Sequence, residues 1–179
     1  MTNTDGVSLI ALDPETGGVT FEGAPFAGLI IYTGMVDRLF EYCEGELPYR
    51  SLKFEFETLD MKQFQPATVV NYPNDQDFTR ITEFKHILSR HSDKTTIVRE
   101  YPVEYNRDDP DRDTPCYTIF NDKNLSKYQT YRSLAKRFSS LFLVGRLAEY
   151  KYYNMDEAVE NALDVVDGLK RRGDPLRIL

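Results

Sequence analysis

The segment from Gly145 to Glu157 constrains the fold more than any other part of the chain. An apolar run at 141–144 leads into it and predicts a short buried strand. Apolar residues then recur at three- and four-residue intervals and predict a helix over 155–169. Asn154 followed by Glu157 matches a capping-box pattern, which places the start of that helix. Unpaired N–H groups point out of such a helix end, so the segment is either a site for an electron-rich ligand or a tight, aromatically packed loop.

Composition restricts the class of protein. Of the 179 residues, 41% are apolar, with 12 Tyr and 11 Phe, which is enough for a core. The net charge of −7 argues against general binding to nucleic acid, so an anionic ligand must be met by a few placed cations. Two cysteines and two histidines are too few for a disulfide scaffold or a metal centre. No apolar run approaches the roughly 18 residues of a membrane span, so we expect a soluble cytoplasmic protein without a membrane partner.

Short apolar or alternating segments predict a mostly antiparallel sheet. The expected strands cover 7–12, 19–22, 28–34, 52–57, 67–72, 78–86 and 95–105, with helices over 36–42 and 124–138 and a turn over 23–26. Neighbouring strands with short connections favour antiparallel pairing. Alternation puts Glu55 and Glu57 on a solvent face, and Pro102 predicts an edge or a bulge. We therefore expect an α+β fold of about six strands with flanking helices and a closing strand–loop–helix.

Several segments resemble the UDP-galactopyranose mutases. Gly145-Arg-Leu-Ala-Glu-Tyr-Lys-Tyr-Tyr-Asn-Met-Asp156 is similar to their C-terminal signature. Tyr32-Thr-Gly-Met-Val-Asp37 resembles their Tyr-Thr-Gly-Pro-(Ile/Val)-Asp, with Met35 in place of the usual Pro. Further similar segments lie, in order, at 47–52, 69–72, 78–83, 99–102 and 115–117. The resemblance therefore covers most of the chain, from residue 28 to residue 168.

The resemblance implies a flavin-dependent isomerase that interconverts UDP-galactopyranose and UDP-galactofuranose for polysaccharide and cell-wall biosynthesis. In that family reduced FAD acts as the nucleophile at the anomeric carbon while UDP leaves. The covalent adduct then lets the sugar ring open and reclose as the furanose. The implied partners are UDP-galactose and UDP-galactofuranose, and a homodimer is open for the intact enzyme.

Arg80 and Asn71 are the first two substrate-binding residues that the resemblance implies. Arg80 matches an arginine on the substrate pyrophosphate, a role that its planar fork suits, and it is our catalytic candidate. The alternative is a surface arginine paired with Glu83 or with a cross-strand acid. Asn71 matches an asparagine near the nucleotide, and its alternative role is to cap the turn before Pro73.

Tyr117 and Tyr152 match tyrosines whose hydroxyl groups reach the pyrophosphate, where a phenol donates without adding net charge. The alternative for each is a core aromatic. Many members of the family carry another Tyr at the position of Cys116, so only Tyr117 is carried over from that pair.

Arg146, Asn154, Met155 and Asp156 match family positions that touch the flavin and its pyrophosphate, which makes them the cofactor-binding candidates. Many members have Asp where this chain has Asn154. Both residue types cap helices well, so the substitution changes the charge expected beside the flavin and not the expected fold.

The glycine fingerprint of dinucleotide-binding proteins, Gly-x-Gly-x-x-Gly after a strand, does not occur in this sequence. We therefore expect the C-terminal part of a mutase, inactive in isolation. Residues 1–34 would return to the FAD domain, 35–122 would form the substrate-side sheet, and 123–179 would close the Rossmann-like FAD domain. One alternative is a non-catalytic sugar-nucleotide-binding or interaction module. Another flavin oxidoreductase is disfavoured by the Asn-Tyr, Thr-Arg-Ile and Lys-Tyr-Tyr segments.

Overall fold

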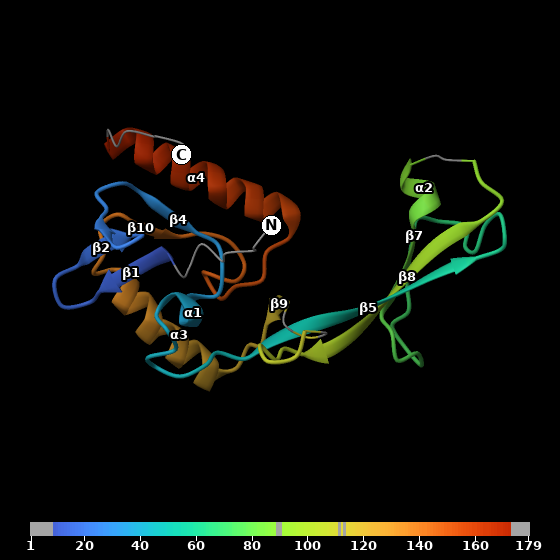
Figure 1. Ribbon diagram of the computed structural model, residues 1–179, viewed down its shortest axis with the longest axis horizontal. Coiled ribbons are helices and arrows are strands. Elements are labelled where there is room, and N and C mark those ends of the chain that lie inside the picture. Colours follow the sequence, from blue (N-terminus) through green and yellow to red (C-terminus); the bar gives the residue numbers. More distant parts are fainter. Residues whose placement is uncertain (1–8, 89–90, 111, 113, 173–179) are drawn as a thin grey trace. The chain divides into compact units, whose positions relative to one another are not determined.

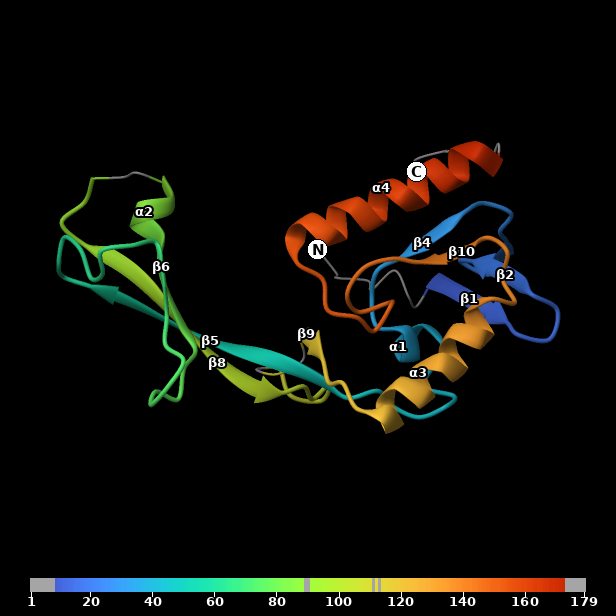
Figure 2. The ribbon, with the colours of Figure 1, turned by 180° about the vertical axis from the view of Figure 1, so that it is seen from behind.

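The computed structural model describes residues 9–88, 91–110, 112 and 114–172. The chain forms two compact units. Unit one comprises Met1–Pro48 and Tyr117–Leu179, and unit two comprises Tyr49–Cys116 (Figures 1 and 2). The expected strand at 7–12 lies partly outside the described residues. The tail beyond residue 172 lies entirely outside them.

Unit one contains two small sheets. The first is antiparallel, in the order β1 (Ile10–Asp13), β2 (Gly18–Phe21) and β3 (Ala24–Pro25). The turn expected at 23–26 is instead at Glu22 and Gly23. The next two residues form the strand β3, which pairs with β2. Both turn residues have positive φ, 51° and 78°, as a tight hairpin of the right twist requires.

The second sheet of unit one joins segments far apart in the sequence. Here β4 (Ile30–Tyr32) pairs in parallel with β10 (Leu141–Leu143). The helices α3 (Asp122–Ala135) and α4 (Met155–Arg172) lie on opposite sides of this pair (Figures 1 and 2). A short helix, α1 (Val36–Leu39), follows β4. The strand–loop–helix expected after residue 141 is therefore present as β10, a loop and α4.

The two long helices of unit one begin at asparagines. The Asn121 side chain accepts a hydrogen bond from the Asn124 N–H at the start of α3. At the start of α4, the Asn154 N–H donates to the Glu157 carboxylate at 2.7 Å, which is half of the predicted capping box. A carboxylate in the first turn also suits the positive end of the helix dipole.

Tyrosines form much of the core of unit one. Tyr131 and Tyr150 are almost fully buried, and each hydroxyl has backbone partners. Tyr131 accepts from the Glu44 N–H and donates to the Gly45 carbonyl oxygen, at 3.0 and 2.8 Å. Burial raises the pKa of both hydroxyls to about 12. These rings can be buried because their polar ends are satisfied.

Unit two is built on an antiparallel sheet. Its strands lie in the order β6 (Val69–Asn71), β7 (Arg80–Glu83), β8 (Thr95–Glu104), β5 (Tyr49–Leu59) and β9 (Pro115–Thr118). The chain passes from unit two back to unit one within β9. The longest ladder joins β5 and β8, from Arg50 opposite Glu104 to Leu59 opposite Thr95. The predicted antiparallel sheet is confirmed, whereas β9 was not predicted as a strand.

Two details of unit two differ from the sequence expectation. The strand expected over 78–86 is shorter, because β7 ends at Glu83 and the chain continues as the helix α2 (Phe84–Leu88). At this junction the Glu83 side chain accepts hydrogen bonds from the Phe64 N–H and the Thr95 hydroxyl. Phe54 and Phe56 alternate with acids as predicted, but their own face is also open, with 46% and 67% of each residue exposed. Phe56 stacks on Phe84 of α2, with ring centroids 6.1 Å apart.

Pro102 occupies a position in β8 that needs no N–H donor toward β7. The β7–β8 ladder runs from Glu83 opposite Ile97 to Arg80 opposite Glu100, so Pro102 lies beyond its last pair. On its other side Pro102 is opposite Leu52 of β5. The strand is thus locally an edge at Pro102, which fits the expectation from sequence.

Candidate functional site

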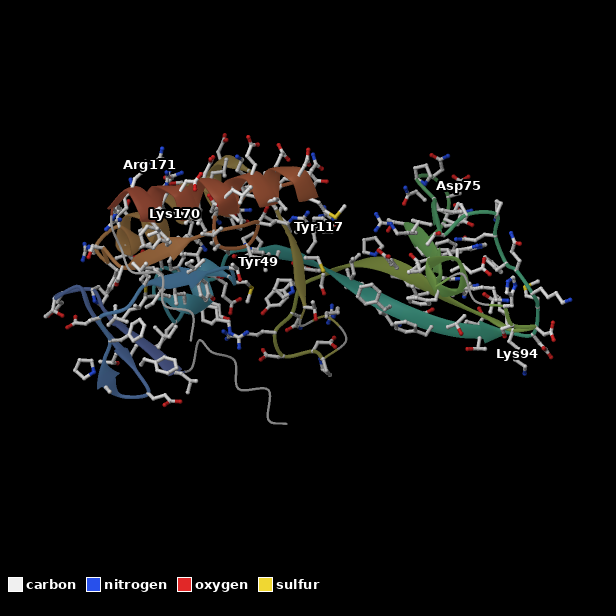
Figure 3. All side chains as sticks on the ribbon, turned by 90° about the horizontal axis from the view of Figure 1, so that it is seen from above. Tyr49, Asp75, Lys94, Tyr117, Lys170 and Arg171 are labelled. Carbon is white, nitrogen blue, oxygen red and sulfur yellow. The ribbon has the colours of Figure 1, made fainter. Side chains whose placement is uncertain are left out.

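Three predicted site residues of unit one, Tyr117, Arg146 and Tyr152, form what we call the tyrosine–arginine cluster. Tyr117 lies on β9 (Figure 3), Arg146 follows β10, and Tyr152 precedes α4. The two phenol rings are nearly parallel, with centroids 6.4 Å apart and planes 16° apart. The Arg146 guanidinium carbon lies over both rings, 4.8 Å from the Tyr117 centroid and 5.2 Å from the Tyr152 centroid. Each distance is within the range of a cation–π contact.

The loop that carries Arg146 is fixed by its own hydrogen bonds. Gly145 has a φ of 89°, in the left-handed region that favours glycine, and its N–H donates to the Glu149 carboxylate at 2.7 Å. The Arg146 Nη2 donates to the Tyr153 carbonyl oxygen at 2.7 Å. Tyr153 is buried, and its ring faces the Lys151 ammonium at 4.5 Å. The guanidinium is therefore anchored to the backbone of the segment that also carries Tyr152.

The tyrosines of this segment divide into core and surface residues. Tyr150 and Tyr153 are buried, and burial raises the pKa of the Tyr153 hydroxyl to about 12, with the negative charge of Glu149 adding to the effect. Tyr152 is 52% exposed and Tyr117 is half-buried. The core alternative considered for Tyr152 does not fit that exposure, and Tyr152 presents a phenol to solvent beside an arginine.

The other two substrate candidates, Asn71 and Arg80, lie together in unit two. They are opposite each other on β6 and β7, and the Arg80 Nε donates to the Asn71 side-chain oxygen at 3.1 Å. The Arg80 Nη1 is 3.7 Å from the Glu100 carboxylate on β8. Both residues line an open cavity of about 420 Å³, together with Tyr72, Pro73, Asn74, Gln76, Asp77, Thr79 and Pro102.

This geometry bears on the structural alternatives for Arg80 and Asn71. Arg80 does pair with a cross-strand acid, but the acid is Glu100 and not Glu83. The Asn71 side chain accepts from Arg80 and so orients the guanidinium. The Arg80 side chain is 44% exposed beside the cavity, so its guanidinium group can still bind an anion there.

Glu83 is a buried acid whose role the sequence did not reveal. Its carboxylate accepts from the Phe64 and Gln65 N–H groups and the Thr95 hydroxyl, and it lies 3.2 Å from the His86 Nε2. Burial by itself raises the pKa of Glu83, but these hydrogen bonds and His86 outweigh it and hold the pKa below its usual value. A signal was available, because Glu83 shares a strand face with the buried Ile81.

The cofactor candidates Asn154, Met155 and Asp156 form the exposed start of α4. Met155 is 87% exposed and begins an apolar stripe that continues with Val159 and Leu163. The stripe borders an open groove of about 660 Å³ with an acidic rim. An exposed apolar side chain beside a helix N-terminus fits the flat ring of a flavin, which needs both apolar contact and donors for its negative edge.

The predicted site residues thus form one pair or cluster in each unit. Asn71 and Arg80 belong to unit two, whereas Tyr117, Arg146, Tyr152 and the start of α4 belong to unit one. Within the described residues, no cluster of three or more histidine, cysteine or acidic side chains could hold a metal ion. No helix in the same part of the chain combines the length and apolar character needed to cross a bilayer.

Comparisons with known proteins identify the family. A family described as UDP-galactopyranose mutase matches residues 9–152. A UDP-galactopyranose mutase of Mycoplasma genitalium is 37% identical over 132 residues, which are 73% of this chain and 33% of that protein. A dTDP-fucopyranose mutase of Escherichia coli is 28% identical over 138 residues, covering 76% of this chain and 36% of the relative. The chain therefore spans about a third of the length of these relatives.

The fold agrees with this assignment. A crystal structure of reduced UDP-galactopyranose mutase superposes with a TM-score of 0.60 at 18% identity, over 92% of this chain and 46% of that one. At that identity the superposition shows a shared fold, and the sequence match over residues 9–152 shows the family. The chain belongs to the UDP-galactopyranose mutase family.

Proposed function

We propose that this chain supplies the pyrophosphate-anchoring and flavin-facing part of a flavin-dependent isomerase that interconverts UDP-galactopyranose and UDP-galactofuranose. The observation that carries the proposal is the tyrosine–arginine cluster, where two phenols share one guanidinium beside the start of a long helix. In the proposed division, the chain is the C-terminal part of the enzyme, and the glycine fingerprint that cradles FAD lies outside its sequence.

Arg80 and Asn71 would bind the pyrophosphate of the UDP-sugar. Arg80 provides a planar fork at the edge of a cavity, and Asn71 already fixes its orientation through Nε. Binding would replace the 3.7 Å contact between Arg80 and Glu100 with closer, bidentate contacts to phosphate oxygens. Because UDP is the leaving group, holding its negative charge is also the catalytic contribution proposed for Arg80.

Within unit one, Tyr117 and Tyr152 would donate their hydroxyl groups to nucleotide phosphate oxygens. Phenols suit this role because they add donors without adding charge, and a neutral donor can release UDP-sugar more readily than a second arginine. The exposure of Tyr152 leaves its ring accessible to a ligand.

Arg146, Asn154, Met155 and Asp156 would face the flavin. Reduced FAD, when bound, supplies the nucleophile that holds the sugar while its ring opens and recloses. The start of α4 would stabilise negative charge at the flavin edge through its free N–H groups, an effect of about 0.3–2 kcal/mol. The Glu157 carboxylate already accepts from the Asn154 N–H, so the remaining first-turn N–H groups would do this.

A sugar-nucleotide-binding module without flavin chemistry is the second candidate. It is favoured by one observation: all four substrate candidates are in this chain. We propose a cytoplasmic location for either function, and either is compatible with a homodimer.

The proposal is tested by calorimetric titration of UDP into the 179-residue chain. We expect saturable binding that Tyr117→Phe and Tyr152→Phe each weaken about twofold to tenfold, as for a lost neutral hydrogen bond. Tyr101→Phe, in the sheet of unit two, is the matched control and should bind like wild type. Equal UDP affinity in the wild type and both site variants would remove the two tyrosines from the site.

A further inference from the structure

Arg146 contacts both substrate-candidate tyrosines at once. Its guanidinium carbon is 4.8 Å from one ring centroid and 5.2 Å from the other, and the rings are within 16° of parallel. Tyr117 and Tyr152 come from a strand and a loop that are distant in the sequence, and Tyr152 is half exposed. An exposed phenol in a loop would otherwise sample several rotamers, so the shared guanidinium is what gives the two rings one arrangement.

The guanidinium is itself held in place. Arg146 Nη2 donates to the Tyr153 carbonyl oxygen at 2.7 Å, and the Lys151 N–H donates to the Arg146 carbonyl oxygen at 3.1 Å. The preceding Gly145 is fixed by Glu149. The ordered loop thus fixes the Arg146 guanidinium, and the guanidinium in turn fixes both rings. Its planar face can stack on an aromatic ring, whereas a lysine ammonium group cannot.

We propose that Arg146 is a positioning residue for nucleotide binding, which holds Tyr117 and Tyr152 as a preformed pair of pyrophosphate donors. This role is additional to its place beside the flavin, and it rests on the proposed function. Two donors aimed at one anion contribute most when both are ordered before the ligand arrives, because the ordering cost is then absent from the binding step. Affinity for UDP therefore depends on Arg146 through the two rings.

Substitutions at Arg146 separate stacking from charge. Arg146→Lys keeps the positive charge but loses the planar group that lies over both rings. Arg146→Met removes the charge and keeps a long apolar side chain. If the residue acts by positioning, both variants should weaken UDP binding by a similar factor, about fivefold to thirtyfold. Arg171→Met, an exposed arginine near the end of α4 (Figure 3), controls for the loss of one positive charge from an acidic chain.

The decisive measurement is a double-mutant cycle on UDP affinity in the 179-residue chain without flavin. In a Tyr117→Ala/Tyr152→Ala background, Arg146→Lys should change UDP affinity by less than about twofold, because the groups through which it acts are gone. The same loss with and without the two rings would overturn the proposal and make Arg146 a direct ligand of the nucleotide. Unchanged UDP affinity in Arg146→Lys would overturn it as well.

A ligand-free measurement distinguishes failure of this inference from failure of the proposed function. Nuclear Overhauser contacts between the Tyr117 and Tyr152 rings should be present in the wild type and lost in Arg146→Met, with the overall spectrum retained. Contacts that persist in Arg146→Met contradict the positioning role whether or not UDP binds. Wild-type chain that shows the contacts but binds no UDP would refute the proposed nucleotide site and leave the ring arrangement established.

Discussion

The Tyr150 hydroxyl donates to the Pro48 carbonyl oxygen at 2.8 Å, and it also lies 3.0 Å from the Ile119 carbonyl oxygen. One phenol therefore joins three segments of unit one that are far apart in the sequence. Tyr150 has a φ of 47°, which bulky residues rarely adopt, so its place in the fold is held by these contacts and by stacking on Tyr128 at 5.7 Å.

Tyr150→Phe should destabilise unit one. The substitution removes the O–H donor of the Pro48 carbonyl oxygen, whereas the Ile119 carbonyl oxygen keeps the Asn124 side-chain donor, so we expect a loss of about 1 kcal/mol of unfolding free energy. Chemical denaturation followed by circular dichroism measures the loss. Tyr152→Phe is the control, because the half-exposed Tyr152 should leave the unfolding midpoint near that of wild type. A Tyr150→Phe chain as stable as wild type would contradict a structural role for this hydroxyl.

Glu83→Gln should destabilise unit two. The Glu83 carboxylate accepts from the Phe64 and Gln65 N–H groups and from the Thr95 hydroxyl, whereas a glutamine must turn an NH₂ group toward donors. We expect a loss of at least about 2 kcal/mol in denaturant unfolding. Glu57→Gln, an exposed acid paired with Arg99, is the matched control and should have little effect.

The Glu83 carboxyl group should also make the stability of the fold depend on pH. The folded-state pKa of Glu83 is below its usual value, so the folded state holds the proton less tightly than the unfolded state. The stabilisation is complete above the unfolded-state pKa and is lost as pH falls through the folded-state pKa. Stability of the wild type should therefore fall in acid more steeply than that of Glu83→Gln. Parallel curves for the two proteins would exclude Glu83 as the source.

The contrast between Glu57 and Glu83 shows what the sequence could predict. Strict alternation at 52–57 predicted the strand and the outward direction of its acids, because a strand has a fixed period of two. The same rule applied to Glu83 places it on the face of Ile81, but it cannot name the loop N–H groups of Phe64 and Gln65 that satisfy the acid. Those partners come from a segment distant in the sequence, so the local pattern could not identify them. The local pattern also did not show that the strand ends at Glu83.

In the candidate site, too, the residues could be predicted from the sequence but their contacts could not. Arg146 and Tyr152 could be selected from the sequence because a dozen neighbouring residues resemble a family signature, and Tyr117 because the separate segment 115–117 resembles another family segment. That Arg146 lies over both Tyr117 and Tyr152 could not be predicted, since Tyr117 comes from a strand that the local pattern did not indicate. The Arg80–Glu100 contact likewise depends on the β7–β8 register.

Glu100 should compete with the nucleotide for Arg80. Arg80→Ala should weaken UDP-galactose binding by about 1.5–3 kcal/mol, as for a lost charged hydrogen bond, with little change in melting temperature. Glu100→Gln removes the competing charge and should strengthen binding several-fold, an effect that falls with added salt. Calorimetric titration of both variants measures this. If Arg80→Ala leaves UDP-galactose affinity unchanged, or lowers the melting temperature sharply, the role of Arg80 is structural.

Unit one should lose stability in alkali. Burial raises the pKa of the Tyr128, Tyr131, Tyr150 and Tyr153 hydroxyls to about 12. These groups ionise in the unfolded state near pH 10, so stability is intact below that value and falls as pH rises toward 12. Tyrosinate absorbance should therefore rise together with loss of the circular dichroism signal. Normal titration of all twelve tyrosines near pH 10 in a folded chain would contradict this burial.

The isolated chain should not retain flavin. Tight FAD binding in this architecture needs a glycine-rich turn for the pyrophosphate as well as the segment from Arg146 to Asp156, and only the second is in this sequence. The purified 179-residue chain should therefore be colourless and should form no UDP-galactofuranose after addition of reduced FAD. Among the residues that the structure describes, the β4–β10 sheet has two strands, and Ile31 on β4 is 49% exposed, so we also expect concentration-dependent self-association in sedimentation experiments. Ile31→Lys should reduce that association without unfolding the chain. A yellow preparation with one FAD per chain, or furanose formation after reduction, would show that the residues present are sufficient for the cofactor.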